Sequence, residues 1–99
     1  MVKPVRPRYD PVRLCTGKAA YEAVPSVPAR VDLDQAARSL ERTGLAVTHA
    51  RVMLIIAVDP EVTLGRDGKI LVKTRDPAIA QQAIEDVWTR IEASPRSPG

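Results

Sequence analysis

The residue types that most often carry catalysis or hold metals are scarce in this chain. His49 is the only histidine and Cys15 the only cysteine, so neither has a companion at the spacing of a metal site. A nucleophilic thiolate also needs a base beside it, and nothing in the sequence places His49 next to Cys15. We therefore expect no catalytic residue, no metal and no cofactor, and we interpret His49 as structural or exposed.

Two further motifs have simpler structural explanations. Thr16-Gly17-Lys18 contains part of a phosphate-binding loop, but it lacks the glycine-rich portion that supplies backbone amides, and no helix follows it. A bend in a strand explains it better. Asp32 and Asp34 are two nearby carboxylates, but they stand at the start of a predicted helix. There Asp32 is better explained as a capping residue, and Asp34 as a charge that favours the helix dipole.

Basic side chains are the remaining chemical signal. Lys69, Lys73 and Arg75 fall on one side of a predicted strand, since residues two apart share a face. We predict that this face binds the phosphate backbone of a nucleic acid, DNA or RNA, with Arg51 and Arg13 beside it. The alternative is a charged sheet edge that resists aggregation, on a domain that serves protein-protein interaction or oligomerisation. No small-molecule substrate is indicated.

The elements that position these residues begin with a predicted hairpin. Two stretches of alternating apolar side chains, 62–64 and 70–72, flank the turn 65–68, whose Asp-Gly pair tolerates positive φ. A helix is predicted over 76–91, capped by an aspartate and a proline at its start. Its apolar stripe, which includes Trp88, must lie on the sheet.

Three more elements precede the hairpin. A first strand is predicted over 12–24, bent or interrupted at Gly17, and a helix over 33–43 that ends at a glycine. The aliphatic run 45–58 predicts one central strand, or two strands with a break near 49–50. The order strand, helix, three or four antiparallel strands, helix predicts an α+β domain with both helices on one face of the sheet.

Length and composition indicate a single domain over 12–93, between a basic proline-rich arm (1–11) outside the core and a disordered tail (94–99). No apolar run approaches the roughly twenty residues of a membrane span, and no signal-peptide pattern is present. One cysteine excludes an internal disulfide, so we expect a cytoplasmic protein with no membrane contact. The absence of Asn and the proline-rich loops suit a thermophile, and a GC-rich genome gives a similar bias.

One strand lacks a second cover. The run 52–58 is apolar on both sides, whereas helices on one face of a sheet cover only one side. A two-fold copy that presents the same patch is the simplest second cover, so we predict a homodimer. We place Met53, Ile55 and Ala57 at its interface and leave open the alternate set Leu54, Ile56 and Val58.

The element order also resembles a known family. The run Asp32-Leu33-Asp34-Gln35-Ala36-Ala37-Arg38-Ser39-Leu40, a sheet, the hairpin sequence Asp67-Gly68-Lys69-Ile70-Leu71-Val72 and a closing helix look like one repeat of the TATA-binding-protein fold, over roughly residues 18 to 92. In that family two repeats form a saddle on the DNA minor groove, and phenylalanines wedge between bases. This chain has one repeat and no Phe, so the resemblance implies the fold and a saddle-like dimer without base insertion.

A looser likeness is to small archaeal domains associated with iron-sulfur proteins. It rests on Cys15-Thr16-Gly17-Lys18 and on the same hairpin and closing helix. One cysteine cannot hold a cluster, so this likeness implies an accessory role in which another protein supplies the thiolates.

Overall fold

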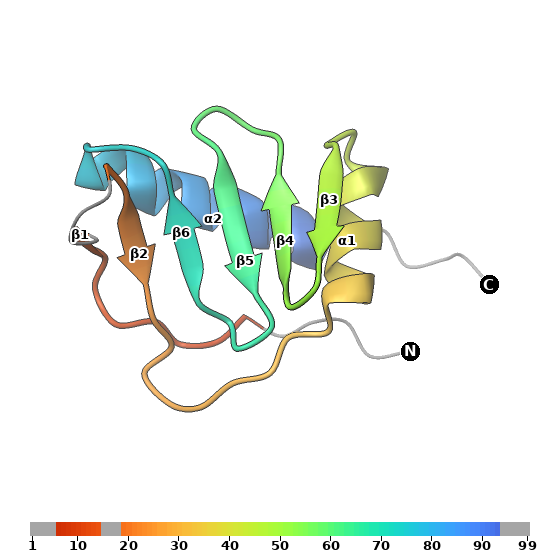
Figure 1. Ribbon diagram of the computed structural model, residues 1–99, viewed down its shortest axis with the longest axis horizontal. Helices are drawn as coiled ribbons and strands as arrows, with labels where there is room; N and C mark the ends of the chain where they lie inside the picture. The colour runs from red at the N-terminus through yellow and green to blue at the C-terminus, as the bar shows by residue number, and fades with distance from the viewer. Residues whose placement is uncertain (1–5, 15–18, 94–99) are drawn as a thin grey trace.

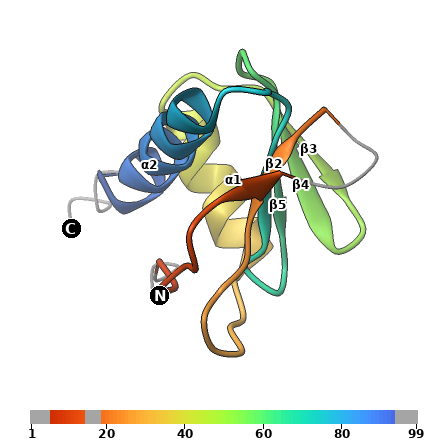
Figure 2. The same cartoon turned by 90° about the vertical axis from the view of Figure 1, so that its left-hand side faces the viewer.

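The computed structural model describes residues 6–14 and 19–93, which form one antiparallel sheet with two helices on one of its faces (Figure 1). The strands are β1 (Arg13–Leu14), β2 (Tyr21–Ala23), β3 (Val47–Ala50), β4 (Met53–Ile56), β5 (Val62–Gly65) and β6 (Ile70–Val72), and the helices are α1 (Leu33–Arg42) and α2 (Pro77–Ala93). In space the strands lie in the order β1-β2-β6-β5-β4-β3. This confirms the predicted α+β class. Figure 2 shows both helices on one side of the sheet, and we call the other side the open face.

Two of the predicted strands prove to be pairs of strands. The predicted strand 12–24 is instead β1 paired with β2, and residues 15–18, which include the predicted bend at Gly17, lie outside the described residues. The run 45–58 folds back at Arg51 and Val52 to give β3 and β4, which pair with each other. The second of the two alternatives for that run is therefore the one adopted, but the break follows Ala50, because His49 and Ala50 still pair with β4.

Two rows of aliphatic side chains form the inner face of the sheet. One row contains Leu54, Leu64 and Ile70, the other contains Ile56, Val62 and Val72, and all six are fully buried. The apolar stripes of α1 and α2 cover these rows, and Leu40 and Trp88 are also fully buried. Because side chains alternate between the two faces of a strand, the intervening residues must project from the open face.

Capping residues set the ends of both helices. The Oδ1 atom of Asp32 accepts a hydrogen bond from the amide of Gln35 at 3.1 Å, and Gly44 follows α1 with a φ of 91°. The Oδ1 atom of Asp76 accepts one from the amide of Ala78 at 2.9 Å, at the start of α2. These contacts confirm the helix starts predicted from the capping signals, whereas α2 continues two residues beyond its predicted end at 91.

The first described residues are part of the packed structure, which corrects the prediction of an arm outside the core. Tyr9 packs against the core and forms a β-bridge with Pro25. Its hydroxyl donates a hydrogen bond to the carbonyl oxygen of Gly68 and accepts one from Nε1 of Trp88 at 3.0 Å. The prolines exclude a helix here, as expected, but an extended segment still docks through one tyrosine.

An arginine fastens the same segment to α2. The Nη1 atom of Arg6 lies 2.8 Å from Oε2 of Glu85, and its Nη2 atom lies 2.8 Å from Oε1 of Glu92. The predicted tail, 94–99, and residues 1–5 of the predicted arm lie outside the described residues.

Gly68 allows this segment to approach the turn between β5 and β6. Its φ is 87°, and a Cβ atom there would lie 3.0 Å from Cγ of Pro25 and 3.3 Å from Cγ of Pro7. Glycine is therefore needed both for the backbone conformation and for the close contact.

The buried indole of Trp88 leads to a first prediction. Trp88→Ala should lower the free energy of unfolding by about 3 to 5 kcal/mol, because transfer energy is lost and a cavity remains. Denaturant titration followed by circular dichroism measures this change. Trp88→Phe keeps one aromatic ring, leaves a smaller cavity and loses the N–H bonded to Tyr9, so it should cost less than Trp88→Ala. Wild-type fluorescence typical of a solvent-exposed indole would contradict the buried position.

The Tyr9 hydroxyl leads to a prediction about alkaline pH. Burial raises the pKa of Tyr9 to about 12, although the hydrogen bond from Trp88 opposes this. The fold thus favours the neutral phenol. The contribution of the neutral Tyr9 side chain to the free energy of unfolding is fully present below the ordinary pKa of 10.0, and it is lost as the pH rises through the pKa of the folded state. The stability difference between wild type and Tyr9→Phe should shrink by about 1 to 2 kcal/mol between about pH 9 and pH 12. Unfolding titrations at several pH values test this, and a constant difference would contradict it.

Candidate functional site

The open face carries the outward side chains of β4. Met53 and Ala57 are exposed and Ile55 is half-buried, whereas Leu54 and Ile56 are fully buried beneath the helices. Of the two sets weighed for a dimer interface, Met53, Ile55 and Ala57 is therefore the set left uncovered by the helices.

A continuous row of side chains crosses the open face from one edge of the sheet to the other. The strand registers place these residues in the order Thr48, Ile55, Thr63, Leu71, Glu22 and Arg13. The centre of this row, Ile55, Thr63 and Leu71, lies in a hollow of about 600 Å³. Met53 also lines the hollow, together with charged residues that include Glu61, Lys69 and Lys73. An apolar floor inside a polar rim is the usual composition of a protein-binding surface.

Acidic side chains pair with three of the predicted phosphate-binding residues. Oε2 of Glu22 lies 3.1 Å from Nζ of Lys69, without hydrogen-bond geometry, and Oε1 lies 3.7 Å from Nε of Arg13. Nζ of Lys73 lies 2.9 Å from Oε1 of Glu61. Glu22 is only 8% exposed, so its charge sits in the face itself. The side of the sheet predicted to be basic therefore presents both signs of charge.

The five predicted phosphate-binding residues do not form one patch. Lys69 and Lys73 line the hollow of the open face, and Arg13 shares Glu22 with Lys69. Arg75 is exposed in the connection between β6 and α2, and Arg51 borders a different hollow near α1. Their role in binding nucleic acid stays a prediction.

The net charge of +3 does not come from the described residues. Lys3, Lys18 and Arg96 lie outside them, and within them the Lys and Arg side chains equal the Asp and Glu side chains in number. The excess positive charge of the whole chain is therefore not a property of the described sheet.

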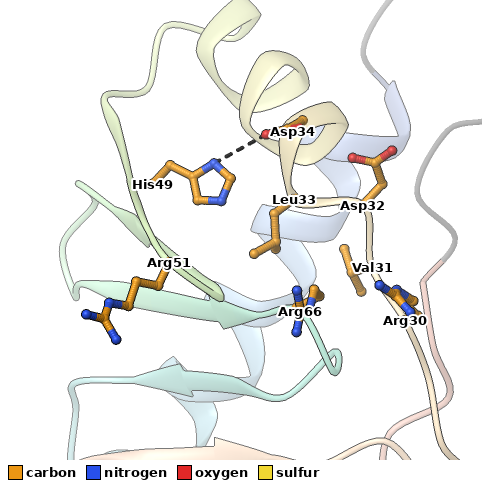
Figure 3. A pocket seen from close by; sticks show the side chains of 8 residues that line it. All are labelled: Arg30, Val31, Asp32, Leu33, Asp34, His49, Arg51 and Arg66. Atoms are coloured by element: carbon orange, nitrogen blue, oxygen red, sulfur yellow. Dashed lines mark ion pairs between the residues drawn. The ribbon is translucent and has the colours of Figure 1, made fainter.

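Three arginines border a second hollow, of about 550 Å³, beside the start of α1 (Figure 3). Arg30 precedes α1, Arg51 is in the turn between β3 and β4, and Arg66 is in the turn between β5 and β6. We call this the arginine hollow. Nδ1 of His49 lies 3.4 Å from Oδ1 of Asp34 at its upper side.

Sequence reasoning missed four residues of these two surfaces. Glu22 and Glu61 were not recognised as partners of the lysines, because their positions depend on strand registers and loop contacts. Arg30 and Arg66 stand in loops whose local sequence gives no sign that they approach Arg51. The only sequence signals near these two arginines were the proline-rich segment before α1 and the hairpin turn, and both indicate loops without indicating that the loops meet. Cys15 lies outside the described residues.

The described part of the chain contains no group of three or more His, Cys, Asp or Glu side chains placed to hold a metal ion. Neither of its helices is long and apolar enough to cross a membrane. Comparisons with protein-family models, curated proteins and solved structures gave no significant match. The resemblances to the TATA-binding-protein fold and to iron-sulfur accessory domains therefore stay predictions.

Proposed function

We propose that the domain is a binding module rather than an enzyme, and that its open face packs against the same face of a second copy. The observation that supports this is the half-buried apolar pair Ile55 and Leu71 on either side of Thr63, on the face that neither α1 nor α2 of the described chain covers. Burying such a pair against an apolar partner stabilises association.

The arrangement of the strands fits a two-fold partner. In the run β2-β6-β5-β4-β3 the middle strand is β5, and Thr63 lies between Ile55 and Leu71. A two-fold axis that runs parallel to β5 and passes over Thr63, between the two facing sheets, would set Ile55 of one copy opposite Leu71 of the other, twice in each dimer. Apolar side chains would then meet apolar side chains at both places.

The charges around this row favour a second copy over a nucleic acid. The rim carries Lys73 with Glu61 and Lys69 with Glu22. A phosphate backbone on this face would meet both carboxylates, whereas a second copy presents the same mixture of signs and can match it. For the same reason we place the predicted oligomerisation function ahead of the nucleic-acid function on this surface.

The same substitution at two neighbouring positions tests the proposed dimer, because the two expected outcomes differ. Ile55→Lys should give a folded monomer, because it places a charge in the proposed interface, while Ile56→Lys should unfold the domain, because that side chain is fully buried. Thr89→Lys, which adds the same charge on the exposed side of α2, should remain dimeric. Sedimentation equilibrium gives the mass, and circular dichroism confirms folding.

A charge-pair experiment tests the two-fold arrangement itself. Leu71→Glu alone should also be a folded monomer. Mixing it with Ile55→Lys should restore a heterodimer, because the introduced lysine then faces the introduced glutamate at one contact and the natural pair faces at the other. A wild type that remains monomeric at high concentration would refute the dimer. Monomeric single variants that fail to associate when mixed would refute this register.

The nucleic-acid function predicts a different result. Lys69 and Lys73 line the same hollow, as the strand pattern predicted, and this observation keeps that function as the second candidate. If these residues and Arg75 contact phosphates, replacing all three with Gln should weaken binding to every sequence and reduce its salt dependence. The affinity of the wild type and of the triple variant for nucleic acid, measured at low and high salt, distinguishes the two functions. The dimer function alone predicts no effect of the triple change on nucleic-acid binding.

A further inference from the structure

The arginine hollow is a second candidate binding surface, separate from the apolar row. We propose that Arg30, Arg51 and Arg66 bind a chain of phosphate groups, such as the polyphosphate of a nucleotide or a nucleic-acid backbone. In the part of the chain that the structure describes, no ion pair or side-chain hydrogen bond engages these three guanidiniums. Arginine is the side chain best suited to phosphate oxygens, because its planar fork offers parallel donors.

Two backbone hydrogen bonds hold the three arginine-bearing segments together. The amide of Val31 donates to the carbonyl oxygen of Arg66 at 2.8 Å, and the amide of Arg66 donates to the carbonyl oxygen of Val52 at 2.8 Å. Arg30 and Arg51 each immediately precede one of these bonded residues. The three loops therefore form one connected unit, and a ligand would not have to order them separately.

The positions of two arginines are further constrained. Arg30 is followed by Val31, which is only 2% exposed and anchors its segment in the core. Arg51 has a φ of 56°, in the left-handed region that non-glycine residues adopt at some cost. The turn thus keeps a long cationic side chain where glycine would be less strained.

The carboxylates near the hollow already have contacts of their own. Oδ1 of Asp32 caps α1 through the amide of Gln35, and Oδ1 of Asp34 lies 3.4 Å from His49. These acids would repel an anion at the helix end itself. The ligand is therefore expected at the arginine rim and not at the amides of α1.

The spread of the arginines indicates an extended anion. Figure 3 shows Arg30 and Arg66 on one side of the hollow, and Arg51 reaching outward from the other side. Successive phosphates along a chain would meet them in turn.

Tripolyphosphate and a short nucleic-acid duplex are suitable probes. The double variant Arg30→Gln/Arg51→Gln should weaken binding of the responsive probe by about tenfold for each guanidinium, as expected for a lost charge-assisted hydrogen bond. Arg38→Gln/Arg42→Gln removes the same charge from the exposed surface of α1, outside the hollow, and should have little effect. Calorimetry measures tripolyphosphate binding, and fluorescence anisotropy at several salt concentrations measures duplex binding.

The outcomes identify the source of the phosphates or refute the site. Weaker binding of both probes supports recognition of a phosphate chain as such, and weaker binding of the duplex alone supports a nucleic-acid backbone. Arg30→Lys/Arg51→Lys should recover only part of the affinity, because Lys keeps the charge and loses the fork. The site is refuted if the wild type binds neither probe, if the double variant binds as the wild type does, or if the α1 control loses as much affinity.

This test does not depend on the proposed dimer. Arg30 and Arg51 do not line the hollow of the open face, so their double variant should keep the wild-type mass in sedimentation. Ile55→Lys should in turn retain phosphate binding if the two surfaces act separately.

Discussion

The alternation of side chains across β4, β5 and β6 is the constraint on which the rest of the structure depends. Both helices pack on one face, so the inward rows, such as Leu54, Leu64 and Ile70, are completely removed from water. A one-residue shift of any of these strands would exchange its buried and outward side chains, which fixes the register strongly. The same constraint leaves Ile55 and Leu71 on the open face, because a strand cannot turn both of its sides toward the helices.

Local signals in the sequence were sufficient for most of this fold. Asp32 and Asp76 cap the helices as predicted, and the alternation on both sides of the Gly65–Gly68 turn gives the central hairpin. The reversal at Arg51 and Val52 was harder to place, since neither residue is a usual turn former and the aliphatic run hides the break. The docking of Tyr9 was missed because it depends on Trp88, far away in the chain.

The candidate sites were less predictable than the fold, because they depend on contacts between distant segments. The spacing of Lys69 and Lys73 correctly placed them on one side of a strand with Leu71. It could not reveal that Glu22, far earlier in the sequence, lies beside Lys69, since that follows from the pairing of β2 with β6. Charge patterns within one element thus indicate a face, whereas the net charge of that face depends on the neighbouring strands.

Arg66 is the residue at which the two proposed surfaces meet. It borders the hollow of the open face and also the arginine hollow, and its amide and carbonyl groups form both hydrogen bonds that join the three loops. A substitution there would remove a cation from both surfaces at once, so its effect could not be assigned to either. Arg30 and Arg51 border only the arginine hollow, and Ile55 borders only the hollow of the open face. The architecture therefore allows the two surfaces to be separated experimentally, even though one turn, between β5 and β6, supports both of them.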